Sequence, residues 1–256
     1  MKHWIYLILR TVILTYIGLG LILFFMQRNY IYFPTNQDFY DCAGFADAEK
    51  VNWQGTRMYV KQKTDRWVVI YHGNAGSACD RSYLKLEFEK LGYSYIFVEY
   101  TGYSNDDLKP SQEKLVKDVK ATIDYLEQFK PGSVAVLGES LGTALASYHA
   151  SVGKVEKLLL IAAFHNLSDL AAYHYKPYPV KLLLRDKFPA EEWLTETDNI
   201  LFIHGARDDI IPVQFGRRFY QGIQADQKQF VEIKGAGHND IYDYPQTYET
   251  IENYLK

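Results

Sequence analysis

Short runs of β-branched and aromatic residues alternate with stretches of helical periodicity along most of this 256-residue sequence. Strands are predicted at 51–53, 57–60, 67–71, 93–100, 133–137, 155–162, 199–204 and 229–233. Helices are predicted at 80–91, 112–129, 143–150, 215–222 and about 245–254. Strands that alternate with helices in this way form a mostly parallel sheet with helices on both faces. The sequence therefore predicts an α/β fold built as one large domain.

The first segment of the chain departs from this pattern because it is almost uniformly apolar. From Trp4 to Met26 only Arg10 is charged, and a helix needs about 20 residues to cross the hydrocarbon layer of a membrane. The stretch is long enough if the Arg10 side chain extends toward the near interface. We therefore expect residues 1–28 to be an N-terminal anchor with one transmembrane helix, and residues 29–256 to form the folded domain.

A cleaved signal peptide is the alternative interpretation of this segment, since Lys2 and Arg10 resemble a charged n-region. No small-x-small cleavage site follows Met26, and this favours an uncleaved anchor. Lys2, Arg10 and the terminal amine together outnumber Arg28 on the other flank. The charge difference predicts an amino terminus in the cytoplasm and a folded domain outside it.

Composition excludes some classes of partner. The 28 basic and 31 acidic residues are mixed along the chain, with no basic block suited to a phosphate backbone, so nucleic acid is not an expected partner. The two cysteines, Cys42 and Cys79, cannot form a disulfide framework or a metal knuckle. A single disulfide between them stays open and would require an oxidising compartment.

Ser140 lies in Gly138-Glu139-Ser140-Leu141-Gly142, between a predicted buried strand and a run of small residues suited to a helix packed on a sheet. A Gly-x-Ser-x-Gly turn in this place needs small residues beside the serine, and it pushes the hydroxyl to the top of the sheet. The pentapeptide alone is common, but its position after a strand makes it a stronger signal. Ser140 is the predicted nucleophile.

A serine nucleophile needs a base within hydrogen-bond reach. His238 follows the last predicted strand, and the glycines at 235 and 237 let the backbone bend so that its imidazole points back over the sheet. An exposed turn histidine is the alternative. The glycine context and the order along the chain make His238 the predicted base.

The base in turn needs an acid that orients it, expected at the end of the preceding strand. Two adjacent carboxylates, Asp208 and Asp209, follow the strand predicted at 199–204. Asp208 is the predicted acid, and its role is to hold the imidazole tautomer without taking the proton. Asp209 is then expected to cap a turn or helix ahead of Pro212.

The oxyanion that forms during acyl transfer needs preorganised N–H donors. One is expected from Leu141, directly after the nucleophile, and the other from the loop after an early strand. His72-Gly73-Asn74-Ala75-Gly76 is that loop, and the Asn74 N–H is the predicted donor. A plain strand-to-helix turn is the alternative, and the glycine motifs of phosphate-binding loops are absent from the sequence.

The other histidines of the domain are expected to be structural. They lack a clustered carboxylate or His-x-x-x-His spacing, and they are His149, His165, His174 and His204. No metal site is expected on this basis. The chemistry of a serine, a histidine and an aspartate also requires no cofactor.

The segment between the strands predicted at 155–162 and 199–204 is longer than a simple crossover needs. Because the carboxyl ends of parallel strands carry the site, residues 164–195 are expected to form a small cap over it. An ordinary crossover helix with irregular flanks is equally compatible. Aromatic residues such as Tyr173 and Tyr178 serve core packing as readily as substrate binding.

Together these motifs resemble the membrane-anchored α/β-hydrolase-domain serine hydrolases related to mammalian α/β-hydrolase domain-containing protein 13 and its fungal polarity-associated homologues. The resemblance covers nearly the whole chain: the anchor, 32–34, 72–76, 138–142, the cap run 174–188, 204–212 and 237–238. It implies an α/β-hydrolase fold with a small cap. Carried over residue by residue, it also implies the triad Ser140, Asp208 and His238.

One departure from these relatives is visible after the strand predicted at 93–100. Relatives often have Asp-Tyr-Arg-Gly-Tyr-Gly where this chain has Glu99-Tyr100-Thr101-Gly102-Tyr103-Ser104. The missing arginine is expected to remove an ion pair or a hydrogen bond at the rim of the site. Relatives include esterases, lipid hydrolases and protein depalmitoylases, so the resemblance implies the reaction type and leaves the substrate open.

The sequence therefore predicts hydrolysis of a carboxylic ester or thioester through an acyl-enzyme. A tether beside the bilayer raises the local concentration of amphiphilic substrates, so acyl lipids or acylated proteins are the expected substrates. One alternative is a small-ester or peptide hydrolase that the anchor merely addresses to the membrane. Another is a non-catalytic scaffold that binds a membrane partner through the tyrosine-rich cap. The sequence leaves the oligomeric state open.

Overall fold

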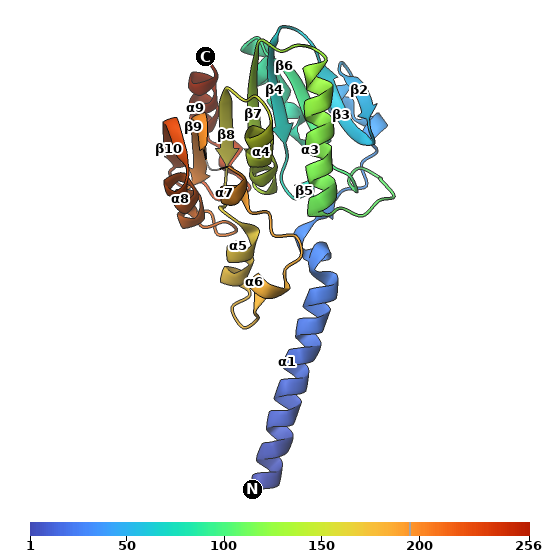
Figure 1. The fold of residues 1–256 in the computed structure, drawn as a ribbon, viewed down its shortest axis with the longest axis vertical. Helices are drawn as coiled ribbons and strands as arrows, with labels where there is room; N and C mark the ends of the chain where they lie inside the picture. The colour runs from blue at the N-terminus through green and yellow to red at the C-terminus, as the bar shows by residue number, and fades with distance from the viewer. Residues whose placement is uncertain (195) are drawn as a thin grey trace.

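An eight-stranded sheet forms the centre of the domain in this computed structural model, which describes residues 1–194 and 196–256 (Figure 1). The strands are β2 (Glu49–Trp53), β3 (Thr56–Lys61), β4 (Arg66–Tyr71), β6 (Ser94–Glu99), β7 (Ser133–Glu139), β8 (Lys157–Ile161), β9 (Glu196–Gly205) and β10 (Gln224–Ile233). Their order is β10-β9-β8-β7-β4-β6-β3-β2, parallel from β10 to β6 and antiparallel at β3 and β2. The mostly parallel sheet predicted from the sequence is confirmed.

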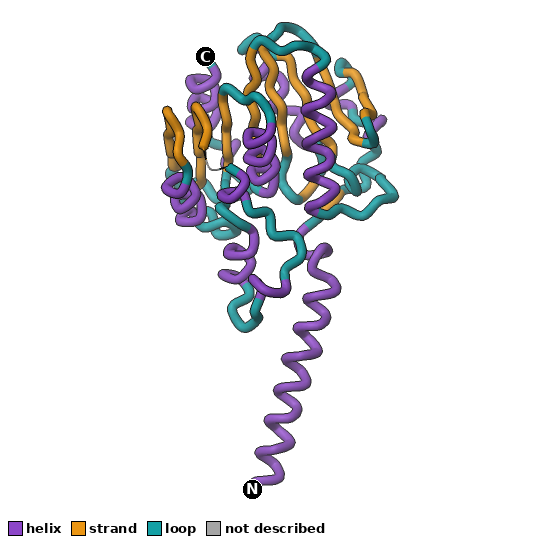
Figure 2. The backbone as a smooth tube through the Cα atoms, viewed as in Figure 1, coloured by secondary structure: helices purple, strands orange, loops and turns teal. Residues whose placement is uncertain are grey.

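Helices cover both faces of the sheet, as Figure 2 shows. They are α2 (Lys85–Lys90), α3 (Gln112–Glu127), α4 (Leu141–Val152), α8 (Val213–Gly222) and α9 (Pro245–Leu255). In the central strand β4, Trp67 and Val69 pack in the apolar cluster under α3, α4 and α8, whereas Val68 and Ile70 pack in the cluster under α2 and α9. Because side chains alternate along a strand, an uninterrupted apolar run such as β4 fits a sheet buried on both faces.

Two elements differ most from their predicted bounds, and the others differ by one to three residues at their ends. The helix expected at 80–91 is a 3₁₀ helix, η3 (Cys79–Leu84), followed by α2. Apolar spacing over so few turns cannot separate three residues per turn from 3.6. Strand β10 begins at Gln224 rather than 229. Its first residues are polar because β10 is an edge strand, where exposed charged side chains are common.

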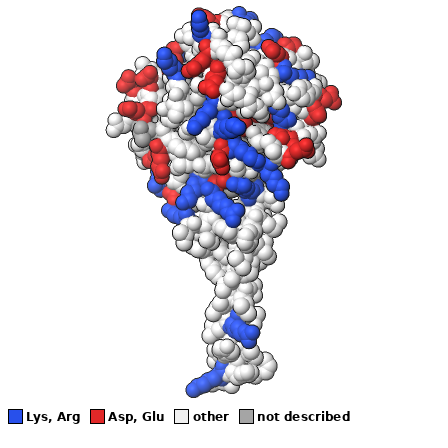
Figure 3. All heavy atoms as spheres, turned by 45° about the vertical axis from the view of Figure 1, so that its right-hand side comes forward, with Lys and Arg blue, Asp and Glu red and all other residues white. Residues whose placement is uncertain are grey.

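The amino-terminal helix α1 (Lys2–Ile31) projects away from the domain (Figure 1). It is 30 residues long and is apolar enough to cross a membrane by length and composition. Figure 3 shows that the projecting part of α1 carries almost no charge, whereas Lys and Arg side chains gather on the domain near its junction with α1. Directly after α1, β1 (Phe33–Pro34) pairs with β5 (Ala75–Gly76), which ties the end of the helix to the loop after β4.

The segment between β8 and β9 contains three short helices, α5 (Leu167–His174), α6 (Val180–Leu183) and α7 (Ala190–Trp193). Helices α5 and α6 lie at the end of the domain from which α1 leaves (Figure 1). Helix α7 instead packs against α4, with the Trp193 and Tyr148 rings 5.2 Å apart. Only α5 and α6 therefore have the position expected of a cap. Its expected end at residue 195 lies outside the described residues.

Cys42 and Cys79 form a disulfide with their Cα atoms 5.9 Å apart. The bond joins the 3₁₀ helices η1 (Phe39–Asp41) and η2 (Ala43–Phe45), on either side of Cys42, to the start of η3. The pairing that the sequence left open is therefore present in the structure. It fixes the segment after α1 against the segment after the Asn74 loop.

Candidate active site

Ser140 lies on the sharp turn between β7 and α4, with φ 51° and ψ −117°. A non-glycine residue rarely adopts this conformation, and it persists only where the surrounding structure enforces it. The flanking glycines allow that close packing: a Cβ on Gly138 would overlap the Gly142 carbonyl, and a Cβ on Gly142 would overlap the carbonyl of Tyr71. The strained turn presents the Ser140 hydroxyl at the carboxyl end of β7.

The structure brings His238 within hydrogen-bond distance of both Ser140 and Asp208, the other two residues of the predicted triad. His238 Nε2 lies 3.1 Å from Ser140 Oγ, and His238 Nδ1 lies 2.7 Å from Asp208 Oδ2. The three residues come from loops or turns after β7, β9 and β10. An Nδ1–H that donates to the Asp208 carboxylate leaves the Nε2 lone pair facing the serine hydroxyl. Asp209 is exposed and lines the pocket in front of Ser140.

Asp208 is held as a carboxylate by the groups around it. Burial acts to raise its pKa, but hydrogen bonds from His204 and His238 outweigh burial and hold the pKa well below its ordinary value. The N–H groups of Ile210 and Ile211 also donate to Oδ1, at 3.0 and 2.7 Å. His204, which the sequence predicted to be structural, has its Nε2 2.8 Å from the Ile211 carbonyl oxygen and 3.4 Å from Asp208 Oδ2.

The two predicted oxyanion donors both line the pocket beside Ser140. Leu141 is the first residue of α4, where a helix leaves its N–H groups without intrahelical partners. The Asn74 carbonyl accepts from Phe33 N–H at 2.9 Å and from the Tyr103 hydroxyl at 2.7 Å. The Asn74 side chain donates to Ile31 O at 2.7 Å, so the end of α1 helps to fix this loop.

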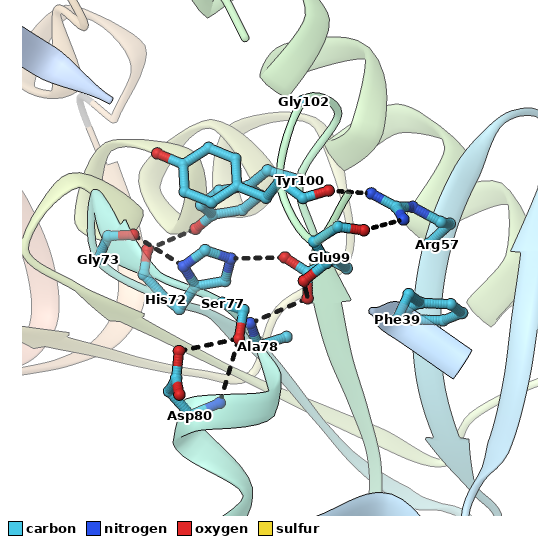
Figure 4. Close-up of polar contacts among 12 residues, drawn as sticks. Phe39, Arg57, His72, Gly73, Ser77, Ala78, Asp80, Glu99, Tyr100 and Gly102 are labelled. Atoms are coloured by element: carbon cyan, nitrogen blue, oxygen red, sulfur yellow. Dashed lines mark hydrogen bonds and ion pairs between the residues drawn. The ribbon is translucent and has the colours of Figure 1, made fainter. Parts of the chain in front are cut away.

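A buried polar pair, His72 and Glu99, links the loop after β4 to the end of β6 (Figure 4). His72 Nε2 lies 3.5 Å from Glu99 Oε1, and the two side chains are 1% and 0% exposed. The other Glu99 oxygen accepts from Ala78 N–H at 3.1 Å and Ser104 Oγ at 2.8 Å. The Tyr100 hydroxyl donates to the His72 carbonyl at 2.6 Å. These bonds join the loop after β4 to the end of β6.

At the position where relatives often have arginine, Thr101 contacts the buried Asp118 of α3. The Thr101 N–H and hydroxyl each donate to Asp118 at 2.8 Å, and the Thr56 hydroxyl adds a third bond at 2.8 Å. Within residues 1–194 and 196–256, no basic side chain pairs with Asp118. Burial raises the pKa of Asp118 to about 6. Asp118 is thus a buried carboxylate whose hydrogen bonds come from neutral donors. That the missing arginine removes an ion pair or a hydrogen bond at the rim of the site stays a prediction.

A pocket of about 830 Å³ opens in front of Ser140 and His238. One wall comes from α5, α6 and the loop between them. Another comes from six residues of α1, namely Gly20, Leu23, Phe24, Gln27, Tyr30 and Ile31. Sequence reasoning did not predict that α1 would line the pocket. In the part of the chain that the structure describes, no group of three His, Cys, Asp or Glu residues could hold a metal ion.

Comparison with known proteins gives the fold a name. No family model matches the chain. An uncharacterized protein of Mycobacterium tuberculosis is 33% identical over 177 residues, which are 68% of this chain and 63% of that protein. Alpha/beta hydrolase domain-containing protein 17C of Xenopus tropicalis is 29% identical over 199 residues, which are 74% of this chain and 62% of that protein. The matches therefore span less than two thirds of these relatives' length.

Among solved structures, one from work on the metagenome-derived lipolytic enzymes LipS and LipT has a TM-score of 0.63 at 20% identity. The alignment covers 80% of this chain and 99% of that chain. The chain has the α/β-hydrolase fold. The resemblance to α/β-hydrolase-domain proteins is confirmed at this level, and the nearer likeness to domain-containing protein 13 stays a prediction. In an α/β-hydrolase, the turn after β7 is where a nucleophile is expected.

Proposed function

We propose that this chain is a membrane-anchored serine hydrolase that cleaves carboxylic ester or thioester bonds. The observation that carries the proposal is the chain of hydrogen bonds from Asp208 through His238 to the hydroxyl of Ser140 on its strained turn. The order serine, aspartate, histidine along the sequence is the one that α/β-hydrolases use. The lipolytic enzymes of similar fold support the same class of reaction.

In the proposed reaction, Ser140 Oγ attacks the substrate carbonyl while its proton passes to His238 Nε2. The N–H groups of Asn74 and Leu141 stabilise the oxyanion, and Asp208 stays ionised beside the imidazolium. The leaving alcohol or thiol then takes the proton from His238. Water attacks the acyl-enzyme with His238 as base, which releases the carboxylic acid and restores the Ser140 hydroxyl.

The location of the substrate follows from the anchor. The apolar helix α1 is proposed to hold residues 29–256 beside the bilayer, where acyl lipids and acylated proteins are concentrated. The domain is proposed to face a compartment outside the cytoplasm, because the Cys42–Cys79 disulfide persists in oxidising compartments. Hydrolysis of small esters or peptides, and a non-catalytic scaffold, are the competing outcomes of the tests.

A fluorophosphonate probe tests the nucleophile directly, because it phosphonylates an activated serine. We expect labelling of the full-length chain in detergent and its loss in Ser140→Ala. Ser147→Ala is the matched control, since Ser147 is buried on α4 and donates to the Thr143 carbonyl away from the pocket. Absence of labelling in the wild type, or equal labelling of Ser140→Ala, would remove the hydrolase proposal and favour the scaffold.

A further inference from the structure

The anchor helix forms part of the pocket in front of Ser140. The α1 residues that line it recur at three- and four-residue spacing and so lie on one face of the helix; they are Gly20, Leu23, Phe24, Gln27, Tyr30 and Ile31. Residues of α5 and α6 form the facing wall, among them Leu170 and Leu183. The pocket thus continues from Ser140 along the helix for about 17 Å, the rise of eleven residues from Ile31 back to Gly20.

Contacts at both ends of this wall hold α1 at a fixed distance from the cap. At the far end, the Tyr16 and Tyr178 rings stack with centroids 4.8 Å apart, and the Tyr16 hydroxyl donates to the Pro177 carbonyl at 2.6 Å. Gly20 permits this approach, because a Cβ there would lie 3.2 Å from the Tyr178 ring. Aromatic packing therefore joins α1 to the cap at this end of the pocket.

At the near end, polar groups of α1 join the cap. The Gln27 side chain accepts from Arg185 N–H at 2.7 Å and donates to the Leu183 carbonyl at 3.4 Å. The next residue, Arg28, pairs with the buried Asp186 at 3.0 Å. An ion pair shielded by burial on one side resists separation more strongly than a fully exposed pair. The helix is fixed here as a part of the domain.

The α1 wall belongs to the part of the anchor suited to the hydrocarbon layer. Residues 11–27 carry no charge, and the wall residues at 20–27 fall within this run. Next to it, the cap exposes apolar side chains, with Leu182 81% exposed. A long acyl chain can therefore pass from the bilayer to the pocket without crossing water, which avoids the cost of hydrating its methylene groups.

We infer that the space between α1 and the cap is the acyl-chain site of this enzyme, filled from the bilayer by the long chain of an ester or thioester. The inference rests on the proposed function, since it places the carbonyl of that chain at Ser140. The anchor then selects the substrate as well as locating the enzyme. A membrane lipid and an acylated protein present the same chain chemistry to this site.

Two tryptophan variants on opposite faces of α1 test whether the helix lines the acyl-chain site or only anchors the enzyme. Leu23→Trp fills the pocket, whereas Ile22→Trp adds the same ring on the outer face, where Ile22 is 51% exposed. The full-length proteins in nanodiscs are compared with p-nitrophenyl palmitate and acetate. We expect Leu23→Trp to lower the palmitate-to-acetate ratio of kcat/KM about tenfold or more, because excluding two methylenes from an apolar site has about that effect.

Ile22→Trp is expected to keep the wild-type ratio. An unchanged ratio in Leu23→Trp, or an equal fall in both variants, overturns the acyl-chain site while leaving the hydrolase proposal intact. Loss of both activities and of fluorophosphonate labelling in the wild type would instead remove the proposed function. If the fluorophosphonate does not label Leu23→Trp, the variant Ala171→Phe narrows the same pocket from the cap side. Its palmitate-to-acetate ratio of kcat/KM then decides the test.

Two further substrates identify the source of the chain. Glycerol monopalmitate in vesicles represents a lipid, and a palmitoyl-thioester peptide represents an acylated protein. If either substrate is hydrolysed, and Leu23→Trp lowers that rate whereas Ile22→Trp does not, the acyl-chain site is supported. The substrate that is hydrolysed shows whether the chain comes from a lipid or from an acylated protein. Turnover of neither by an enzyme that hydrolyses p-nitrophenyl acetate overturns the inference and favours a small-ester hydrolase.

Discussion

Asp208 illustrates how single hydrogen bonds define the proposed chemistry. Its Oδ1 accepts from two backbone N–H groups, and its Oδ2 accepts from His238. The two oxygens thus have separate tasks, one fixing the loop and the other fixing the imidazole. A substitution that changes only Oδ2 therefore tests the role of the carboxylate without disturbing the loop.

Asp208→Asn is that substitution, because the amide oxygen can keep the bonds to the N–H groups of Ile210 and Ile211. The amide NH₂ cannot accept from His238 Nδ1, so the imidazole loses the tautomer that takes a proton from Ser140. We expect kcat for p-nitrophenyl acetate to fall by about 10⁴, as in serine proteases with the same change. A fall below tenfold at an unaltered melting temperature would argue against Asp208 as the orienting acid.

Among the contacts between elements, the one between α3 and the loop after β6 contains a buried carboxylate, Asp118, that is unfavourable when ionised. Asp118 is buried there with hydroxyl and N–H donors and, among the residues that the structure describes, has no cation beside it; burial raises its pKa to about 6. A carboxyl whose pKa is higher in the folded chain binds its proton more tightly there than in the unfolded chain. The ionisation of Asp118 therefore lowers the free energy of unfolding as the pH rises from about 4 to 6, and at lower pH this loss is absent.

The variant Asp118→Asn, which is neutral at every pH, isolates this effect. Relative to the variant, the wild type should lose about 3 kcal/mol of unfolding free energy between pH 4 and pH 7, from about two pKa units at 1.36 kcal/mol each. The amide also loses an acceptor for Thr101 N–H, but that cost does not vary with pH. Urea unfolding of both full-length proteins in detergent measures the difference, and a pH-independent difference would contradict the raised pKa.

The elements that sequence reasoning predicted well are those whose signal is local. The turn around Ser140, the glycines before His238 and the carboxylates after β9 each follow a strand, so their placement at the carboxyl end of a parallel sheet could be expected. The wall contributed by α1 could not, because it depends on contacts such as Tyr16 with Pro177, 161 residues apart. The residue pattern within α1, or within the loop at 177–178, does not indicate which distant segment it contacts.

At the scale of the whole molecule, charge and covalent structure bear on the orientation in the membrane. Basic side chains near the junction with α1 include Lys114, Lys117, Lys120 and Arg185 (Figure 3). Taken alone, they would favour a cytoplasmic domain. The rule that relates positive charge to orientation counts residues within about 15–20 positions of the membrane helix, however, and these lie far along the sequence. The disulfide is therefore the stronger indication, and it favours an oxidising compartment.

Reporter fusions at Lys256 test this orientation in a bacterial host. Alkaline phosphatase needs its own disulfides and so is active only outside the cytoplasm, whereas green fluorescent protein reports a cytoplasmic position. We expect phosphatase activity without fluorescence. Acid quenching followed by alkylation with a maleimide-polyethylene glycol should also leave the wild type unmodified, while Cys42→Ser gains one adduct on Cys79. Fluorescence together with two adducts on the wild type would place the domain in the cytoplasm, and the Cys42–Cys79 bond would then be absent in the cell.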